Sequence, residues 1–169
     1  MNTKVKDMTT AALFIAIICV FAQLKINITG FVPITLQTLA IYLIGGILKP
    51  QPAFFCLSGY LVIGAIGLPV FSNFGSGLGS LFGMTGGYLI IFPFMAASIS
   101  YLIHKRVNIV LAYFLGTVLC YSFGTVWFMY YTEQTLQASL ALCVYPFLFG
   151  DAIKIMIACF LYHKIKRVY

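Results

Sequence analysis

Long apolar segments separated by short polar connections set the strongest constraint on how this chain folds. Charged residues make up only 8% of the sequence, whereas a soluble domain holds about 25%. A transmembrane helix needs about 20 consecutive, mostly apolar residues. The segments of this kind are 8–24, 31–48, 53–67, 86–103, 109–131 and 142–162. We therefore predict an all-α integral membrane protein with six transmembrane helices, surrounded by lipid.

The length and the spread of charge limit the other possibilities. The 169 residues suffice for one compact bundle, so we expect a single membrane domain over 1–169. The net charge of +7 lies in scattered short segments, which argues against nucleic-acid binding. The first apolar stretch has no small-residue cleavage site followed by a soluble domain, so we interpret it as a helix and not a signal peptide. The cysteines form no C-x-x-C pair and are expected to be buried hydrophobes.

The positive charges predict the orientation of the helices. If both termini lie in the cytoplasm, all of the 10 lysines and arginines except Lys25 and Lys154 fall on the inner side. Inner segments of membrane proteins carry an excess of these residues. Trp127 then falls at the outer end of the fifth helix, as expected for an interfacial aromatic belt. We expect a multi-pass protein of the plasma membrane with cytoplasmic N- and C-termini.

One acid and one base stand inside the last apolar segment. Asp151 is one of only 3 acidic residues, and Lys154 follows it by three positions, so both share one helical face. Ionisable side chains at membrane depth are costly and usually mark a substrate or ion path. With the last helix running inward, Asp151 lies about 13 Å below the outer boundary. A structural ion pair is the other interpretation, but buried pairs stabilise weakly, so we favour a ligand site.

A long glycine-rich connection joins the third and fourth helices. Residues 69–85 carry no charge, and such connections in compact proteins are often lids or binding loops. Phe71 and Phe74 are atypical of a disordered linker, so we predict a packed lid over the outer mouth of a cavity. Asn73, Thr85 and Tyr88 are expected to reach the same cavity. No phosphate-binding G-x-x-x-x-G-K-[ST] motif occurs in the chain.

Two further groups of residues are candidates for contacts. Thr35, Gln37 and Thr38 lie in the outer half of the second predicted helix, where polar side chains need partners in the bundle or in a ligand. Ala12 and Ala16 form a small-x-x-x-small pattern, which permits close approach of another helix, inside the bundle or from a partner. No Ser/His/Asp set, H-E-x-x-H motif or pair of carboxylates occurs. We therefore expect neither catalysis nor a bound metal.

Three segments together resemble the BioY family, the biotin-specific substrate-binding components of energy-coupling factor transporters. Residues 32–39 (VPITLQTL) are similar to the family's P-x-T-x-Q-T pattern. The stretch from 64–71 through 83–89 (GMTGGYL) is similar to its G-P-T-G-G-Y-L segment, with Met84 in place of the usual proline. Asp151-x-x-Lys154 is similar to the D-x-x-K of the family's last helix.

The resemblance implies a non-enzymatic subunit that captures biotin outside the cell and needs no cofactor. A transmembrane coupling protein and two cytoplasmic ATPases would drive uptake, and Ala12 and Ala16 would contact the coupling protein. Asp151 and Lys154 would hold polar groups of biotin, in an order that the sequence leaves open. The substrate-binding residues that the resemblance implies are Asp151, Lys154, Asn73, Tyr88, Phe71, Phe74, Gln37 and Thr35.

A self-contained secondary transporter or channel is the alternative, with Asp151 and Lys154 as an ion or proton relay. Such transporters commonly contain an internal repeat. No clear repeat relates residues 1–84 to residues 85–169. A membrane enzyme or assembly factor is disfavoured because the sequence contains no catalytic set of residues.

Overall fold

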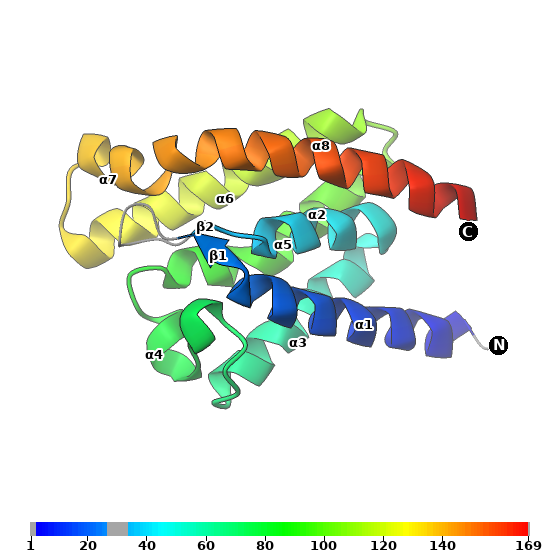
Figure 1. Ribbon diagram of the computed structural model, residues 1–169, viewed down its shortest axis with the longest axis horizontal. Coiled ribbons are helices and arrows are strands. Elements are labelled where there is room, and N and C mark those ends of the chain that lie inside the picture. The colour runs from blue at the N-terminus through cyan, green and yellow to red at the C-terminus, as the bar shows by residue number, and fades with distance from the viewer. Residues whose placement is uncertain (1–2, 27–33, 169) are drawn as a thin grey trace.

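A computed structural model describes residues 3–26 and 34–168, which form a bundle of helices (Figure 1). The longer helices are α1 (Thr3–Gln23), α2 (Gln37–Ile47), α3 (Pro50–Ala65), α5 (Gly86–His104), α6 (Ile109–Thr132) and α8 (Tyr145–Val168). The short elements are the 3-10 turn η1 (Ser72–Phe74) and the helices α4 (Gly77–Leu81) and α7 (Leu136–Cys143). An antiparallel ladder pairs β1 (Lys25–Ile26) with β2 (Ile34–Thr35) and joins the end of α1 to the start of α2.

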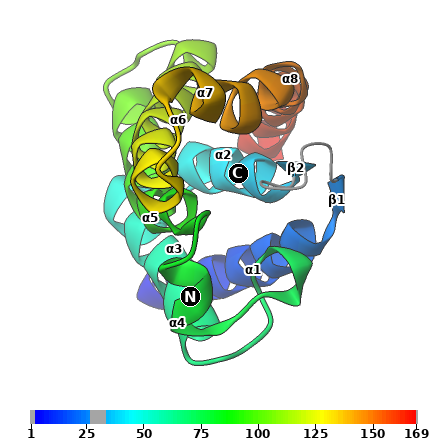
Figure 2. The same ribbon diagram turned by 90° about the vertical axis from the view of Figure 1, so that its left-hand side faces the viewer.

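Helix α2 lies at the centre of the bundle (Figure 2). Nine of its 11 residues are buried, and it packs against α1, α5 and α8. Its sequence is apolar on every side except at its first turn, which is the pattern of a helix with no face toward solvent. Helix α5 packs against α3 and α6 in addition to α2. The core therefore forms around α2 and α5, and a cavity lies beside the first turn of α2.

The described helices differ in whether they can cross a membrane alone. Among the described residues, α5, α6 and α8 are long and apolar enough to do so, while α1 contributes the shorter apolar stretch Met8–Gln23. Helix α2 has 11 residues and is only about 17 Å long, less than the roughly 30 Å of the hydrocarbon core. The prediction of an all-α membrane bundle is supported, and three of the six predicted spans meet the length requirement.

Predicted helix boundaries were off by up to six residues, and two of the differences have a clear structural cause. The second helix, predicted over 31–48, begins only at Gln37, because residues 34–35 pair in the β-ladder; residues 31–33 lie outside the described part of the chain. The last helix, predicted over 142–162, is interrupted at Val144, which lies between α7 and α8. Pro146 has no backbone N–H and fits the first turn of a helix better than its interior, so α8 begins beside it.

The two ends of the bundle differ in what they carry. Helix α1 begins and α8 ends at one end of the bundle, whereas α4 and α7 lie at the opposite end (Figure 1). The predicted lid, residues 69–85, is not extended chain, since it contains η1 and α4. This arrangement places the glycine-rich connection at the end of the molecule away from the start of α1 and the end of α8.

Candidate functional site

A cavity of about 430 Å³ lies beneath the glycine-rich connection. Its volume falls within the roughly 300–1,000 Å³ typical of small-molecule pockets. The wall is formed by residues of β2, α2, α5, α6, α7 and α8 together with the connection between α3 and α5. The apolar and aromatic part of the wall includes Phe71, Tyr88, Leu89, Phe92 and Phe147. This mixture of an apolar wall with a few polar groups is typical of a ligand site.

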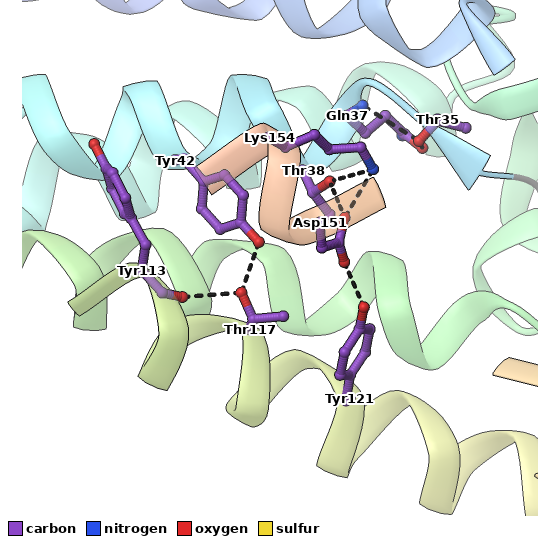
Figure 3. A network of polar contacts seen from close by, with 9 residues as sticks. All are labelled: Thr35, Gln37, Thr38, Tyr42, Tyr113, Thr117, Tyr121, Asp151 and Lys154. Atoms are coloured by element: carbon purple, nitrogen blue, oxygen red, sulfur yellow. Dashed lines mark hydrogen bonds and ion pairs between the residues drawn. The ribbon is translucent and has the colours of Figure 1, made fainter. Parts of the chain in front are cut away.

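The only ion pair that the structure shows among the described residues lies in this cavity (Figure 3). Lys154 Nζ is 2.8 Å from Asp151 Oδ1, and the two residues are 6% and 4% exposed. Their spacing of three residues on α8 brings both side chains to one face, as the sequence predicted. Because removing a charge from water is expensive, burial of both groups requires further hydrogen bonds.

Two hydroxyl groups from other helices supply those hydrogen bonds. Thr38 of α2 accepts from Lys154 Nζ at 3.0 Å and donates to Asp151 Oδ1 at 3.2 Å. Tyr121 of α6 donates its phenolic O–H to Asp151 Oδ2 at 2.5 Å. Helices α2, α6 and α8 are therefore joined at a single carboxylate. The pair is held in a fixed geometry before any ligand enters.

The network leaves hydrogen-bonding capacity on both charged groups. A carboxylate offers about four acceptor sites and an ammonium group offers three donors. Among the described residues, Asp151 accepts three hydrogen bonds and Lys154 donates two. One acceptor site on Asp151 and one N–H on Lys154 are thus available to a ligand. A neutral group that presents an N–H beside a carbonyl oxygen is the chemical complement of this arrangement.

Thr35 and Gln37 also line the cavity, but their polar atoms bind protein groups. Gln37 Nε2 donates to Tyr60 Oη at 2.8 Å, and Gln37 Oε1 accepts from Thr35 Oγ1 at 3.1 Å. Tyr60 Oη in turn donates to the carbonyl oxygen of Val70 at 3.0 Å. These contacts tie the start of α2 to α3 and to the beginning of the glycine-rich connection. Their effect on a ligand is to shape the wall.

Tyr88 is fixed in the wall by the packing of α5 on α6. Its Oη lies 3.3 Å from Thr125 Oγ1 of α6. Its ring sits against Gly124, where a Cβ atom would lie 2.2 Å from Tyr88 Cε1. Only a residue without a side chain permits this approach, so Gly124 sets the position of the Tyr88 ring.

The loop residues singled out in the sequence separate into two groups. Phe71 is 2% exposed and Asn73 is exposed, and both line the cavity. Phe74 is 70% exposed and does not belong to the cavity wall. In this structure the connection therefore brings Phe71 and Asn73, but not Phe74, to the cavity wall. Ala12 and Ala16 are exposed on α1, away from this wall.

Tyr121 is the site residue that the sequence reasoning missed. Its signal is a polar stripe of period four along the fifth apolar segment, formed by Tyr113, Thr117, Tyr121 and Thr125. Such a stripe lies along one face of a helix. Tyr42 of α2 contacts the same stripe, with its Oη 2.6 Å from Thr117 Oγ1. The charged pair indicated α8 alone, but this polar face of α6 also contacts the pair, through Tyr121.

Metal ligation and disulfide bonding find no support in the described residues. No group of three or more His, Cys, Asp or Glu side chains in this part of the chain could hold a metal ion. All five cysteines are free, and three of them, Cys56, Cys120 and Cys143, are buried. Cys120 and Cys143 contribute apolar surface to the cavity wall.

A model of the BioY family matches the whole chain, residues 1–169. The chain belongs to the BioY family. The BioY relative "Biotin transporter BioY2" of Lactococcus lactis subsp. cremoris is 40% identical over 157 residues, which cover 90% of this chain and 86% of that protein. The "Probable biotin transporter BioY" of Pyrococcus horikoshii is 33% identical, and the match covers 96% of this chain and 98% of that protein. The family resemblance seen in the sequence is confirmed.

The fold agrees with a solved structure over nearly its full length. That structure is the S-component for biotin from an ECF-type ABC transporter, and it superposes with a TM-score of 0.91 at 28% sequence identity. The match covers 98% of this chain and 93% of that chain. Together with its long apolar helices, membership of the BioY family makes this chain a membrane protein.

Proposed function

We propose that this chain binds biotin at the outer side of the plasma membrane as the S-component of an energy-coupling factor transporter. The observation that carries the proposal is the buried Asp151–Lys154 pair inside a cavity of about 430 Å³, in a chain whose relatives are named biotin transporters. A transmembrane coupling protein and two cytoplasmic ATPases energise uptake. The chain itself performs capture and catalyses no reaction.

The ureido ring of biotin matches the hydrogen-bonding groups that remain available on the ion pair, one acceptor site on Asp151 and one N–H on Lys154. Lys154 donates its remaining N–H to the ureido oxygen, and Asp151 accepts one ureido N–H. Burial of the neutral ureido group costs far less than burial of the carboxylate of biotin. The carboxylate therefore lies toward the mouth of the cavity, where Asn73 is exposed. Phe71 and Tyr88 enclose the apolar bicyclic body between the two polar ends.

Calorimetry on the purified chain in detergent tests the proposal. We expect one biotin to bind per chain, with an enthalpy that reflects hydrogen bonds to charged groups, each contributing about 1.5–3 kcal/mol. A folded protein that shows no heat of binding and no thermal stabilisation by biotin would contradict the assignment of the ligand.

Two biotin derivatives distinguish which polar end meets the ion pair. Biotin amide lacks the carboxylate but keeps the ureido ring, so we expect its affinity to stay within about tenfold of that of biotin. 2-Iminobiotin has an imino nitrogen in place of the ureido oxygen, and its protonated ring offers Lys154 no acceptor, so we expect its binding to be lost at neutral pH. The opposite ranking would place the carboxylate at Lys154.

The proposed orientation puts both termini in the cytoplasm, with α1, α2, α3, α5, α6 and α8 as six membrane passes. The shared position of the start of α1 and the end of α8 supports an even number of passes (Figure 1). The excess of lysine and arginine at that end supports its cytoplasmic placement. Ala12 and Ala16, exposed on α1, are proposed to face the coupling protein, because small side chains permit close helix approach.

Transport assays in proteoliposomes separate this function from a self-contained transporter. With biotin outside, the chain alone is expected to bind but not to accumulate it, whereas the chain with its coupling protein and ATPases accumulates it when ATP is inside. Accumulation driven by an ion gradient in the absence of those partners would support the relay function for Asp151 and Lys154.

A further inference from the structure

A side chain at the end of α1 holds the connection that lies over the cavity. Gln23 Nε2 donates to the backbone carbonyl oxygen of Phe71 at 3.0 Å, and Gln23 Oε1 accepts the backbone N–H of Phe74 at 3.1 Å. Both ends of one carboxamide group therefore bind the same short loop, although the loop follows 48 and 51 residues later in the chain. We call the segment 71–75 the pinned loop.

The pinned loop is tightly closed and contains an unusual backbone conformation. The N–H of Phe71 donates to the carbonyl oxygen of Gly75 at 3.0 Å, and the N–H of Gly75 donates to that of Ser72 at 3.1 Å. Asn73 and Phe74 have φ angles of 63° and 54°. Asparagine adopts this left-handed region readily, whereas a bulky residue such as Phe74 persists there only when its surroundings hold it. The amide that Gln23 accepts belongs to this strained residue.

The start of the pinned loop is fixed to α3 as well as to α1. Tyr60 of α3 donates to the carbonyl oxygen of Val70 at 3.0 Å. The ring of Phe71 rests on Gly64, where a Cβ atom would lie 2.0 Å from Phe71 Cζ. These two contacts fix Val70 and seat the ring of Phe71. Gln23 is the side chain that holds the far side of the loop, at Phe74.

The two hydrogen bonds of Gln23, to Phe71 and to Phe74, determine which residues of the pinned loop line the cavity. Ser72 and Asn73, between the two hydrogen bonds, line the cavity. Phe74 points away and is 70% exposed. If the carboxamide releases, Phe74 is free to leave its left-handed conformation, and the path of Asn73 changes with it. Asn73 is therefore kept in the wall by a residue that does not itself line the cavity.

We propose that Gln23 is a positioning residue that sets how long a bound ligand stays in the cavity. Its two hydrogen bonds keep the pinned loop in the wall, and loss of them opens a route for release. The inference rests on the proposed function, with biotin as the ligand. We expect the dissociation rate of the ligand to depend strongly on Gln23, and its association rate to depend on Gln23 only weakly.

Two measurements on the full-length chain in detergent test the proposal. The first is native-state hydrogen exchange of the Phe74 amide without ligand, and the second is the dissociation rate of labelled biotin. Gln23→Met, similar in shape but unable to form either bond, is expected to accelerate both by about tenfold or more. Gln23→Glu keeps the acceptor for Phe74 but loses the donor to Phe71, so an intermediate effect is expected. Gln51→Met, an exposed glutamine on α3, is the matched control and leaves both rates unchanged.

Each outcome has a defined meaning. Unchanged exchange at Phe74 in Gln23→Met would overturn the role of Gln23 as the group that holds the loop. Faster exchange with an unchanged dissociation rate would overturn the link to ligand residence. If the wild-type chain binds no biotin, the proposed function fails, while the exchange measurement still decides whether Gln23 holds the loop. Should Gln23→Met fail to fold, the graded effect of Gln23→Glu decides the same question.

Discussion

Asp151 is the residue on which the candidate site depends most. It is 4% exposed and accepts hydrogen bonds from Lys154, Thr38 and Tyr121, which come from α8, α2 and α6. A buried carboxylate that accepts three hydrogen bonds is satisfied, but removal of one donor strongly destabilises the folded protein. The ligand-binding role that we propose for the pair would therefore couple ligand recognition to the stability of the bundle.

This coupling predicts different effects for single and double substitutions of the pair. Asp151→Asn and Lys154→Met each leave one buried charge without its partner, so each is expected to destabilise the protein by roughly 3–5 kcal/mol. The double variant removes both charges and is expected to recover most of that stability. All three variants should bind biotin at least about tenfold more weakly, a loss of about 1.4 kcal/mol or more.

Thermal unfolding and calorimetry on the same samples separate the two effects. Recovery of stability without recovery of binding in the double variant is the expected pattern. If the double variant regained both, the pair would be a structural ion pair with no part in ligand binding.

The phenol of Tyr121 provides a milder test at the same carboxylate. Tyr121→Phe keeps the ring and removes only the donor to Asp151 Oδ2, so the carboxylate loses a hydrogen bond worth about 1.5–3 kcal/mol to a charged group. We expect biotin affinity to fall by about tenfold in equilibrium binding. Tyr130→Phe, 87% exposed on the same helix, is the control. Equal effects of the two substitutions would remove Tyr121 from the site.

At the scale of elements, the wall of the cavity depends on how closely α5 and α6 approach. Gly124 of α6 accommodates the ring of Tyr88, whose Oη also contacts Thr125. Trp127, one turn along α6 from Gly124, donates its indole N–H to the carbonyl oxygen of Gly83 at 2.9 Å. The position of the glycine-rich connection is thus set partly by the same helix that supplies Tyr121.

Adding one methyl group at this contact is expected to disturb the wall. In Gly124→Ala the new Cβ would lie 2.2 Å from Tyr88 Cε1, so the ring must move, at a cost of about 1–3 kcal/mol in stability. We also expect weaker biotin binding in calorimetry, because Tyr88 lines the cavity.

Gly59→Ala is the control, since its Cβ would meet Ile15 Cδ1 at an ordinary 3.4 Å and alanine favours a helix. If both variants unfolded at the same temperature and bound biotin equally, the close packing of Tyr88 on Gly124 would not matter for the site.

The sequence predicted helix positions correctly where the length of an apolar segment was enough to define the helix. The fifth helix was predicted over 109–131 and is observed at Ile109–Thr132. The β-ladder before α2 was not predictable in this way, because pairing of residues 34–35 with 25–26 depends on a contact across the connection. The break at Val144 was missed because the apolar pattern continues through it, although Pro146 marked the place.

The site was predictable to the extent that charge in an apolar segment is conspicuous. Asp151 and Lys154 were found on that ground, and the structure brings them into contact. Thr38 was singled out as a polar residue of the second helix, but its contact with the ion pair emerges only when the helices are placed together. Tyr121 is uncharged and was missed altogether. Phe74 was expected in the cavity with its neighbours, but the left-handed backbone at Asn73 and Phe74 turns it outward, which the residue types did not reveal.

At the scale of the whole molecule, the start of α1 and the end of α8 lie at the same end of the bundle, and this predicts which residues face each side of the membrane. A cysteine placed at Glu133, beyond the end of α6 and exposed, is expected to react with a membrane-impermeant maleimide added to intact cells. A cysteine at His163, exposed near the end of α8, should react only after the membrane is permeabilised. The reverse pattern would invert the proposed orientation, and labelling of both from outside would rule out an intact transmembrane arrangement.

The ion pair also has an electrical consequence for the empty protein. Lys154 and Asp151 carry opposite charges 2.8 Å apart, so together they contribute no net charge to the cavity. Moving one elementary charge through 100 mV involves about 2.3 kcal/mol of work, whereas moving a neutral pair involves almost none. A rearrangement that carries the vacant site across the membrane field is therefore insensitive to voltage at this position. The carboxylate of a bound anion would be the charge on which the membrane potential acts.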